Sequence, residues 1–312
     1  MKGHAGTIGN EQSDLLAKQG AIKDDNDRLD LEIPKEFDLQ GARLASLTQA
    51  TAYRGIKERK PDKPRNLTQR NIQLTIEAIQ DYTGSSETEA TIWRGLRRSA
   101  IRPRISQFLY KTMHSTQKIG TYWDHIPGYQ DRQTCQSCGR MESMEHILIK
   151  CEERPTRIIW QLARESWPEQ TYKWPDISLG LILGCGSITS PREIAHQNEQ
   201  QVEQDRRSCN VKGPTRLMQI TITESAHLIW ILRCERVIRE KQHSDREIQT
   251  RWLRAINTRL INDKITATKI KRESKYQHLV KTTWEPLLRQ QGVPPENWLN
   301  DRVVLVGRRP RG

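Results

Sequence analysis

The feature that most constrains the fold of this chain is a short run of metal-ligand residues in its middle. The run has the spacing Cys-x2-Cys-x7-His-x4-Cys, and its members are Cys135, Cys138, His146 and Cys151. A Cys-x2-Cys hairpin offers two thiolates to one ion, and a helical turn over residues 144–151 would bring the other two ligands to the same side. Three sulfurs and one imidazole make a closed tetrahedral Zn²⁺ site, which is structural rather than catalytic.

The segment that carries these ligands is short and polar, so it has too little apolar surface to fold alone. Binding of Zn²⁺ would therefore supply its folding free energy. Buried free thiols and redox chemistry are the alternatives to a metal site. The remaining cysteines are widely spaced, and we interpret Cys185, Cys209 and Cys234 as ordinary thiols.

The composition favours an anionic partner. The chain has 51 Lys and Arg against 38 Asp and Glu, which gives a formal net charge of +13 at pH 7. Such a balance raises the rate of association with polyphosphates. The cysteine usage suits a reducing compartment better than a disulfide framework. The sequence has neither an apolar run of membrane-spanning length nor a signal peptide, so we expect an intracellular protein, nuclear or cytoplasmic, that is not secreted and binds no membrane.

The mean hydropathy of −0.80 argues against one large hydrophobic core. We therefore expect a mainly α fold, built from small helical units that polar linkers join. Apolar residues recur at helical spacing in residues 214–242 and again in residues 248–269, which predicts a C-terminal helical hairpin. The alternative is that these two apolar stripes form a surface for a partner or for self-association.

Residues 92–112 form the clearest basic stretch, because they contain no Asp or Glu. The basic residues of the stretch are Arg94, Arg97, Arg98, Arg102, Arg104 and Lys111. On a helix, Arg97 shares a face with Arg94 or Arg98, so their side chains can follow a phosphate backbone. We predict that the basic residues bind nucleic acid and that the interleaved aromatic residues are mostly core. A solvated basic face over that core is the alternative interpretation.

Residues 2–14 read KGHAGTIGNEQSD and lead into the helical LLAK of residues 15–18. This stretch resembles the end of a type-1 ribonuclease H domain, where a loop with a histidine precedes the C-terminal helix and the last catalytic carboxylate. The match covers only the final part of such a domain. The alternative interpretation is that Asn10 or Asp14 merely caps a helix.

The resemblance implies roles for two residues. His4 would be the mobile histidine that assists proton transfer and product release. Asp14 would be the fourth carboxylate of a two-Mg²⁺ site that cleaves the RNA strand of an RNA–DNA hybrid. The family places its other carboxylates earlier in the domain, upstream of the position of Met1. We therefore expect an incomplete catalytic remnant, because one carboxylate cannot hold two ions.

A second resemblance joins this end of the chain to the cysteine segment. Residues 121–129 read TYWDHIPGY and precede the Cys and His ligands. Residues 1–21 and 100–168 resemble the C-terminal region of LINE-type (non-LTR) retrotransposon polyproteins, in which a zinc-binding segment follows the reverse transcriptase and ribonuclease H domains. The resemblance implies roles in reverse transcription, binding of RNA, DNA or their hybrid, and association with the upstream polyprotein.

These expectations define the regions of the chain. They are a truncated ribonuclease H remnant (1–21), a helical linker (22–91), a basic helix with the zinc-binding module (92–183), a flexible linker (184–213) and a C-terminal helical region with a basic tail (214–312). We expect a nucleic-acid-binding protein that is not catalytic alone. The alternatives are a hybrid ribonuclease whose other carboxylates come from upstream or from another chain, with Mg²⁺ as its cofactor, and an inactive retroelement relic.

Overall fold

The computed structural model describes residues 8–25, 32, 47–59, 65–152, 154–168, 172–189, 212–270, 275–289, 292–301 and 304–307. The described part of the chain is mainly helical, which confirms the predicted fold class. The chain divides into two compact units, residues 1–63 and residues 64–312. Each unit is described by itself below.

The first unit contains helices α1 (Ile8–Ala21) and α2 (Gln49–Arg59). The side chains described on α1 are exposed, and α2 has no buried residue. Helix α1 begins at Ile8, so Asn10 and Asp14 both lie inside it. The interpretation that either residue caps the helix is therefore wrong, because a capping residue stands outside the first turn.

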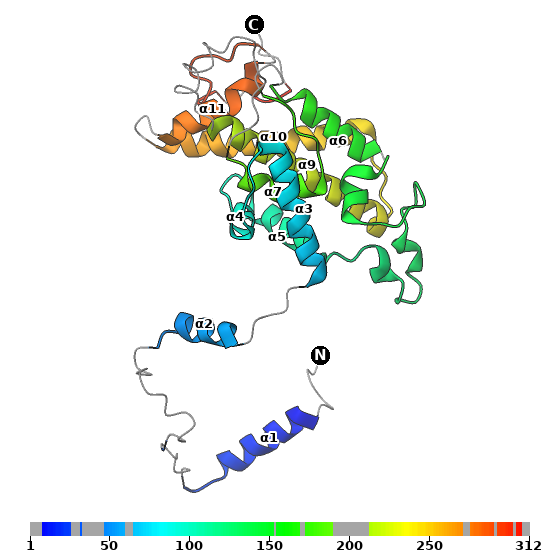
Figure 1. Ribbon diagram of the computed structural model, residues 1–312, viewed down its shortest axis with the longest axis vertical. Coiled ribbons are helices and arrows are strands. Elements are labelled where there is room, and N and C mark those ends of the chain that lie inside the picture. Colours follow the sequence, from blue (N-terminus) through cyan, green and yellow to red (C-terminus); the bar gives the residue numbers. More distant parts are fainter. Residues whose placement is uncertain are drawn as a thin grey trace. The chain divides into compact units, whose positions relative to one another are not determined.

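The second unit contains the remaining described helices (Figure 1). Its α-helices are α3 (Asn66–Thr83), α4 (Glu89–Gly95), α5 (Pro103–Met113), α6 (Arg154–Glu165), α7 (Leu179–Gly184), α9 (Lys212–Arg239), α10 (Asp245–Lys269) and α11 (Lys275–Arg289). Shorter turns are the 3-10 helices η3 (Gly120–Trp123), η4 (Gln130–Gln133) and η6 (Cys185–Ser187) and the π-helical turn η5 (His146–Lys150).

Local sequence signals fix several helix ends. Helix α3 ends before Gly84, which has φ +76° and whose amide donates to the Gln80 carbonyl. A glycine adopts this left-handed conformation without a steric penalty from Cβ. Helix α10 begins after Ser244, whose hydroxyl accepts from the amide of Glu247. This contact satisfies one of the amides that have no partner inside the first turn.

Helices α3 and α7 lie side by side (Figure 1). Gly180 makes this approach possible, because a Cβ at that position would lie 2.3 Å from the carbonyl oxygen of Leu74. Every residue from Gly180 to Gly184 is buried. Helix α3 falls in the predicted linker region 22–91, but it packs inside the same compact unit as the cysteine segment.

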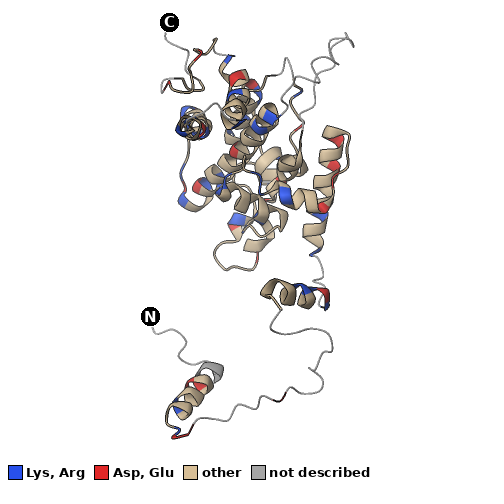
Figure 2. Cartoon of the chain, turned by 90° about the vertical axis from the view of Figure 1, so that its left-hand side faces the viewer, with Lys and Arg blue, Asp and Glu red and all other residues tan. Residues whose placement is uncertain are grey.

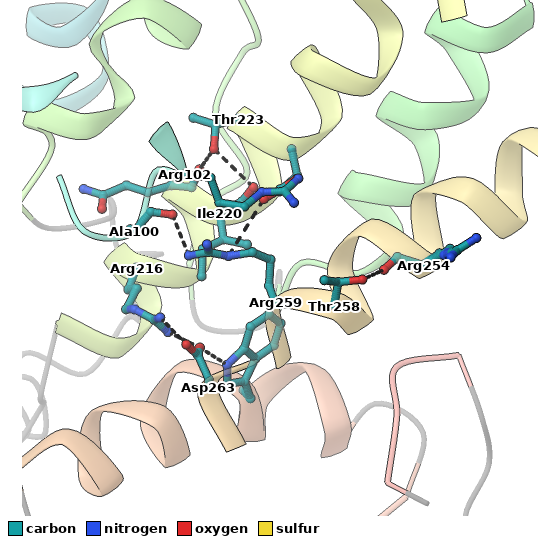
Figure 3. Close-up of polar contacts among 12 residues, drawn as sticks. Ala100, Arg102, Arg216, Ile220, Thr223, Arg254, Thr258, Arg259 and Asp263 are labelled. Atoms are coloured by element: carbon teal, nitrogen blue, oxygen red, sulfur yellow. Dashed lines mark hydrogen bonds and ion pairs between the residues drawn. The ribbon is translucent and has the colours of Figure 1, made fainter. Parts of the chain in front are cut away.

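Helices α9 and α10 run antiparallel, as two polar contacts at opposite ends demonstrate. Arg216 near the start of α9 contacts Asp263 near the end of α10, with nitrogen–oxygen distances of 2.6 and 2.7 Å (Figure 3). Glu235 near the end of α9 contacts Arg251 near the start of α10 at 2.6 and 2.9 Å. The predicted C-terminal helical hairpin is thus present.

Helix α9 is the centre of this unit. It contacts α5, α6, α7, α10, α11 and the turn η5. Almost every residue of its first turns is buried, and the buried set includes Thr223, Glu224 and Ser225 as well as apolar side chains. A helix enclosed on all sides need not have a polar face. None of the described helices is both long enough and apolar enough to cross a membrane.

Candidate metal centre

A tight hairpin positions the first two predicted ligands. The Cys135 amide donates to the Arg140 carbonyl at 2.8 Å, and the Gly139 amide donates to the Cys135 carbonyl at 2.7 Å. Gly139 has φ +70°, a conformation that favours glycine at this turn. An antiparallel bridge between Thr134 and Met141 closes the hairpin. We call residues 134–142 the ligand hairpin.

The turn η5 positions the other two predicted ligands. The Cys151 amide donates to the His146 carbonyl at 2.7 Å, a hydrogen bond that spans five residues as in a π-helix. The sequence predicts a helical turn here, and in the structure the turn is wider than an α-helical one. Helix α6 holds it in place, because the Trp160 indole donates to the Leu148 carbonyl at 2.7 Å and the Thr156 hydroxyl donates to the Ile147 carbonyl at 3.2 Å.

The hairpin and the π turn bring the predicted ligands together. Their ligand atoms, in Cys135, Cys138, His146 and Cys151, all lie within 4.8 Å of one another. The Sγ atoms of Cys135 and Cys151 are 3.7 Å apart, and Cys138 Sγ is 3.4 Å from His146 Nε2. A tetrahedral ion with bonds of roughly 2.3 Å to sulfur and 2.0 Å to nitrogen separates two sulfurs by about 3.8 Å and a sulfur from a nitrogen by about 3.5 Å. The group can therefore hold a metal ion.

Cys135 and Cys151 are not joined by a disulfide, since their sulfur atoms lie 3.7 Å apart and that bond is about 2.05 Å long. Cys135, His146 and Cys151 are buried, whereas Cys138 is exposed. The centre is thus shielded on most sides and reaches the surface at one ligand.

The pKa of the Cys135 thiol is lower than that of a free cysteine. Burial disfavours its thiolate, but hydrogen bonds with His146, the backbone of Ser137 and Cys138, and the Cys151 side chain outweigh burial and lower the Cys135 pKa to about 6. The thiolate is the form that binds metals. Cys185 is different, because complete burial raises the pKa of its thiol to about 12.

Helix α9 supports the ligand hairpin with two arginines. Arg233 forms a buried ion pair with Glu142 of the hairpin, and the two side chains are only 5% and 1% exposed. Arg236 lies one turn further along the helix, with Nη2 3.9 Å from Cys135 Sγ and Nη1 3.3 Å from Ser137 Oγ. Arg236 thus places positive charge beside the Cys135 sulfur, whereas the charge of Arg233 is balanced by Glu142. The contacts of Arg233 and Arg236 with the ligand hairpin could not be predicted from residue spacing, because both arginines are far from the ligands along the chain.

A cavity of about 360 Å³ borders the centre. It is lined by Cys135, His146 and Cys151 and by the basic residues Arg154, Arg236 and Lys241. Within the described residues Lys241 pairs with Glu247 at 3.0 Å, and Arg154 lies 3.8 Å from Asp245. The charges of Arg154 and Lys241 are therefore partly neutralised by acidic residues near the start of α10.

The predicted nucleic-acid-binding residues lie on α4, on α5 and in the segment between the two helices. Helix α4 ends at Gly95, so Arg97 and Arg98 are not helical and the helix face expected for Arg97 with Arg94 or Arg98 is not formed. Those exposed to solvent are Arg94, Arg97, Arg98, Arg104 and Lys111, which we call the basic surface. Arg98 Nε also donates to the Gly186 carbonyl at 3.2 Å. Among the interleaved aromatics Phe108 is buried and Trp93 is half-buried, but Tyr110 is 51% exposed. Lys and Arg also occur on other helices of the chain (Figure 2).

Arg102 differs from the other basic residues of the stretch. Its guanidinium donates to the carboxylate of Glu224, whose side chain is 2% exposed, while Arg102 itself is 28% exposed. Arg259 also approaches Glu224, with Nε 3.8 Å from a carboxylate oxygen. Its Nη2 donates to the Ala100 carbonyl at 2.9 Å (Figure 3). Burial raises the Glu224 pKa, and the nearby arginines only partly oppose this effect. Arg102 thus already has a buried acidic partner.

The remaining predicted site residues belong to the first unit. Asp14 is exposed on α1, and His4 lies outside the described residues. Within the described ranges, the Cys and His cluster of the second unit is the group of three or more metal-ligating side chains that lie close together, and Asp14 is not part of it.

Comparison of the chain with family models, with curated proteins and with solved structures finds no match. The resemblance to ribonuclease H and to LINE-type polyproteins therefore stays a prediction from the sequence.

Proposed function

We propose that this chain is a nucleic-acid-binding protein whose fold around residues 120–160 depends on a structural Zn²⁺ ion, and that it corresponds to the C-terminal region of a LINE-type retrotransposon polyprotein. The observation that carries the proposal is the basic surface on α4, on α5 and in the segment between them. Its side chains are exposed, and the stretch of residues 92–112 that carries them contains no carboxylate. Phosphate groups are the partners that suit such a surface.

The choice of Zn²⁺ rests on the ligand chemistry. Three thiolates and one imidazole in tetrahedral arrangement are typical of structural zinc sites, whereas Mg²⁺ and Ca²⁺ prefer oxygen ligands. The ion would be held by Cys135, Cys138, His146 and Cys151. All four positions of the tetrahedron would be filled by protein, which leaves no open position for a substrate. The ion would therefore stabilise the ligand hairpin and the π turn rather than take part in a reaction.

The sequence-independent part of nucleic-acid binding is electrostatic. Each phosphate that a basic side chain neutralises releases a counterion, so affinity for duplex falls with a slope of about −0.9 per contact in a plot of log K against log salt. Binding through most of the basic surface predicts a slope of about −4, which corresponds to a loss of affinity of roughly 100-fold or more between about 50 and 200 mM salt.

The test combines metal analysis with a salt titration of the full chain. We expect one Zn²⁺ per chain, retained in Cys234→Ser and lost in Cys138→Ser. Labelled RNA, DNA and hybrid duplexes should bind with the steep salt dependence described above. The variant Arg97→Ala/Arg98→Ala should reduce the salt slope by about 2, whereas the matched control Arg254→Ala, which removes an exposed arginine of α10, should not. Undetectable binding, or binding that does not depend on salt, would refute the proposed function.

A further inference from the structure

Three aromatic rings, two exposed and one half-buried, cluster next to the ligand hairpin. Tyr122 and Trp123 lie 5.1 Å apart, centroid to centroid, with ring planes at 89°, and Trp123 and Tyr129 lie 5.9 Å apart at 43°. Tyr122 and Tyr129 are 43% and 44% exposed. In contrast to Trp93, none of the three is packed against the hydrophobic core. Large rings left at the surface in a cluster, rather than singly, indicate a binding role.

Two cations accompany the rings. The guanidinium carbon of Arg132 lies 4.5 Å from the Tyr129 centroid and 5.3 Å from that of Trp123. Lys118 Nζ lies 5.4 Å from the centroid of Tyr122. Distances within about 6 Å allow a cation–π interaction. In the part of the chain that the structure describes, no carboxylate forms a salt bridge with either cation, so both retain donors for an anion. We call these five residues the ring surface.

The ring surface is fixed to the metal centre by the backbone. The Trp123 indole donates to the Lys118 carbonyl at 2.8 Å. Gly120 has φ +54°, and a Cβ there would lie 2.4 Å from the Glu142 carbonyl oxygen, so this part of the chain passes directly against the ligand hairpin. The Glu142 amide donates to the Gln133 carbonyl at 2.9 Å, which joins the other end of the ring surface to the same hairpin.

Clustered rings with unpaired cations suit a partner that offers flat π faces and negative charge together. Single-stranded nucleic acid has both, because its bases are free to leave the stack and each is joined to a phosphate. A duplex presents its phosphates but keeps its bases stacked inside. The basic surface can bind the phosphates of single-stranded and of duplex nucleic acid. The ring surface adds stacking on bases, which only unpaired strands offer.

We propose that the ring surface binds single-stranded RNA or DNA, with bases stacked on Tyr122 and Tyr129 and phosphates held by Arg132 and Lys118. This inference rests on the proposed function and assigns it a preference for unpaired strands. Trp123 and the ligand hairpin keep the two tyrosines at a fixed spacing, so fewer degrees of freedom are lost when a strand binds.

The test compares three labelled probes of equal length, roughly 12 nucleotides, at one salt concentration. They are oligothymidylate, an abasic phosphodiester strand and a duplex. The full-length variant Tyr122→Ala/Tyr129→Ala should bind oligothymidylate at least about 5-fold more weakly, since one lost base–ring stack has this effect. Its affinity for the duplex and for the abasic strand should stay the same. The variant Tyr122→Phe/Tyr129→Phe should bind all three probes like the parent, because phenylalanine keeps the ring.

The matched control is Tyr53→Ala, which removes another exposed tyrosine that has a lysine over its ring, Lys57 at 5.6 Å, in the first unit. It should leave oligothymidylate binding unchanged. Equal affinity of the alanine variant and the parent for oligothymidylate, or an equal loss for oligothymidylate and the abasic strand, would overturn the ring-surface inference alone. Failure of the parent to bind any of the three probes would overturn the proposed function as well.

Discussion

Arg233 of helix α9 and Glu142 of the ligand hairpin form a buried ion pair between positions 91 residues apart in the sequence. Arg233 Nε donates to Glu142 Oε1 at 3.1 Å, and Nη2 donates to the second carboxylate oxygen. The Trp230 ring lies under the same guanidinium, 5.6 Å from its central carbon. The pair links the metal centre to the central helix of the second unit.

Removal of one partner of this pair should be severely destabilising. In Arg233→Ala the Glu142 carboxylate stays buried without its cation, and such a change costs about 3–5 kcal/mol. We expect the free energy of unfolding, measured by urea denaturation, to fall by that amount, and the metal content of the purified protein to fall with it. Arg239→Ala is the control, because Arg239 is exposed near the end of the same helix. A loss below about 1 kcal/mol would show that the pair is dispensable.

Two arginines of the basic stretch should respond differently to truncation. Arg97→Ala should weaken nucleic-acid binding, reduce the salt slope by about 1 and leave stability within about 0.5 kcal/mol, since Arg97 is exposed. Arg102→Ala should lower stability by about 1–3 kcal/mol, because Glu224 loses its closest cation inside the fold. Paired denaturation curves and binding titrations check both variants. If Arg102→Ala is as stable as the parent, Arg102 does not stabilise the fold through Glu224 and does not differ from Arg97 in this respect.

His227 should make the protein sensitive to mild acid. Burial and the charges of Arg104 and Arg102 lower the His227 pKa from 6.5 to about 4, so the unfolded chain takes up a proton at a higher pH than the folded chain. The resulting stabilisation is complete above pH 6.5, is lost as the pH falls towards 4 and amounts to about 3 kcal/mol. Glu224, whose pKa is raised, acts in the opposite direction.

His227→Gln isolates this effect, because glutamine stays neutral at every pH in that range. We expect the stability difference between parent and variant to shift in favour of the variant between pH 7 and pH 4.5, as measured by denaturant unfolding at several pH values. A difference that does not change with pH would mean that His227 titrates normally in the folded protein.

Thiol labelling should report the state of the metal centre. Cys138 is exposed but should be protected while the ion is bound, and chelation should make it react with iodoacetamide. Cys185 should stay unlabelled in both states, because it is completely buried with a pKa of about 12. Mass spectrometry of peptides before and after chelation measures both. Equal labelling of Cys138 in the two states would argue against a bound ion.

Features that depend on near neighbours in the sequence could be predicted. The spacing of the Cys and His residues identified a group whose ligand atoms do come together, since a tight turn and one helical turn are local structures. The apolar period of residues 214–269 identified the helical hairpin for the same reason. Gly84 ends α3 in a left-handed conformation, which is also a local property of glycine.

Features that depend on contacts between residues far apart in the sequence could not be predicted. The π turn at His146–Lys150 receives hydrogen bonds from Thr156 and Trp160, which a helical period does not encode. Arg102 looked equivalent to Arg97 in the sequence, but its partner Glu224 is 122 residues away. The pairing of Glu142 with Arg233 could not be predicted, because a buried ion pair produces no periodic pattern in the sequence.

The metal centre takes its ligands from one short stretch but its supports from helices α6 and α9. A peptide excised around residues 130–152 would carry every ligand and none of the groups that hold the turn and the hairpin, namely Thr156, Trp160 and Arg233. If that peptide were grafted into another protein, the four ligands would be transferred but the contacts that fix their arrangement would not. Because α9 in turn packs against α5, α6, α7, α10 and α11, a fragment that is meant to keep this geometry must include those helices as well as the ligands.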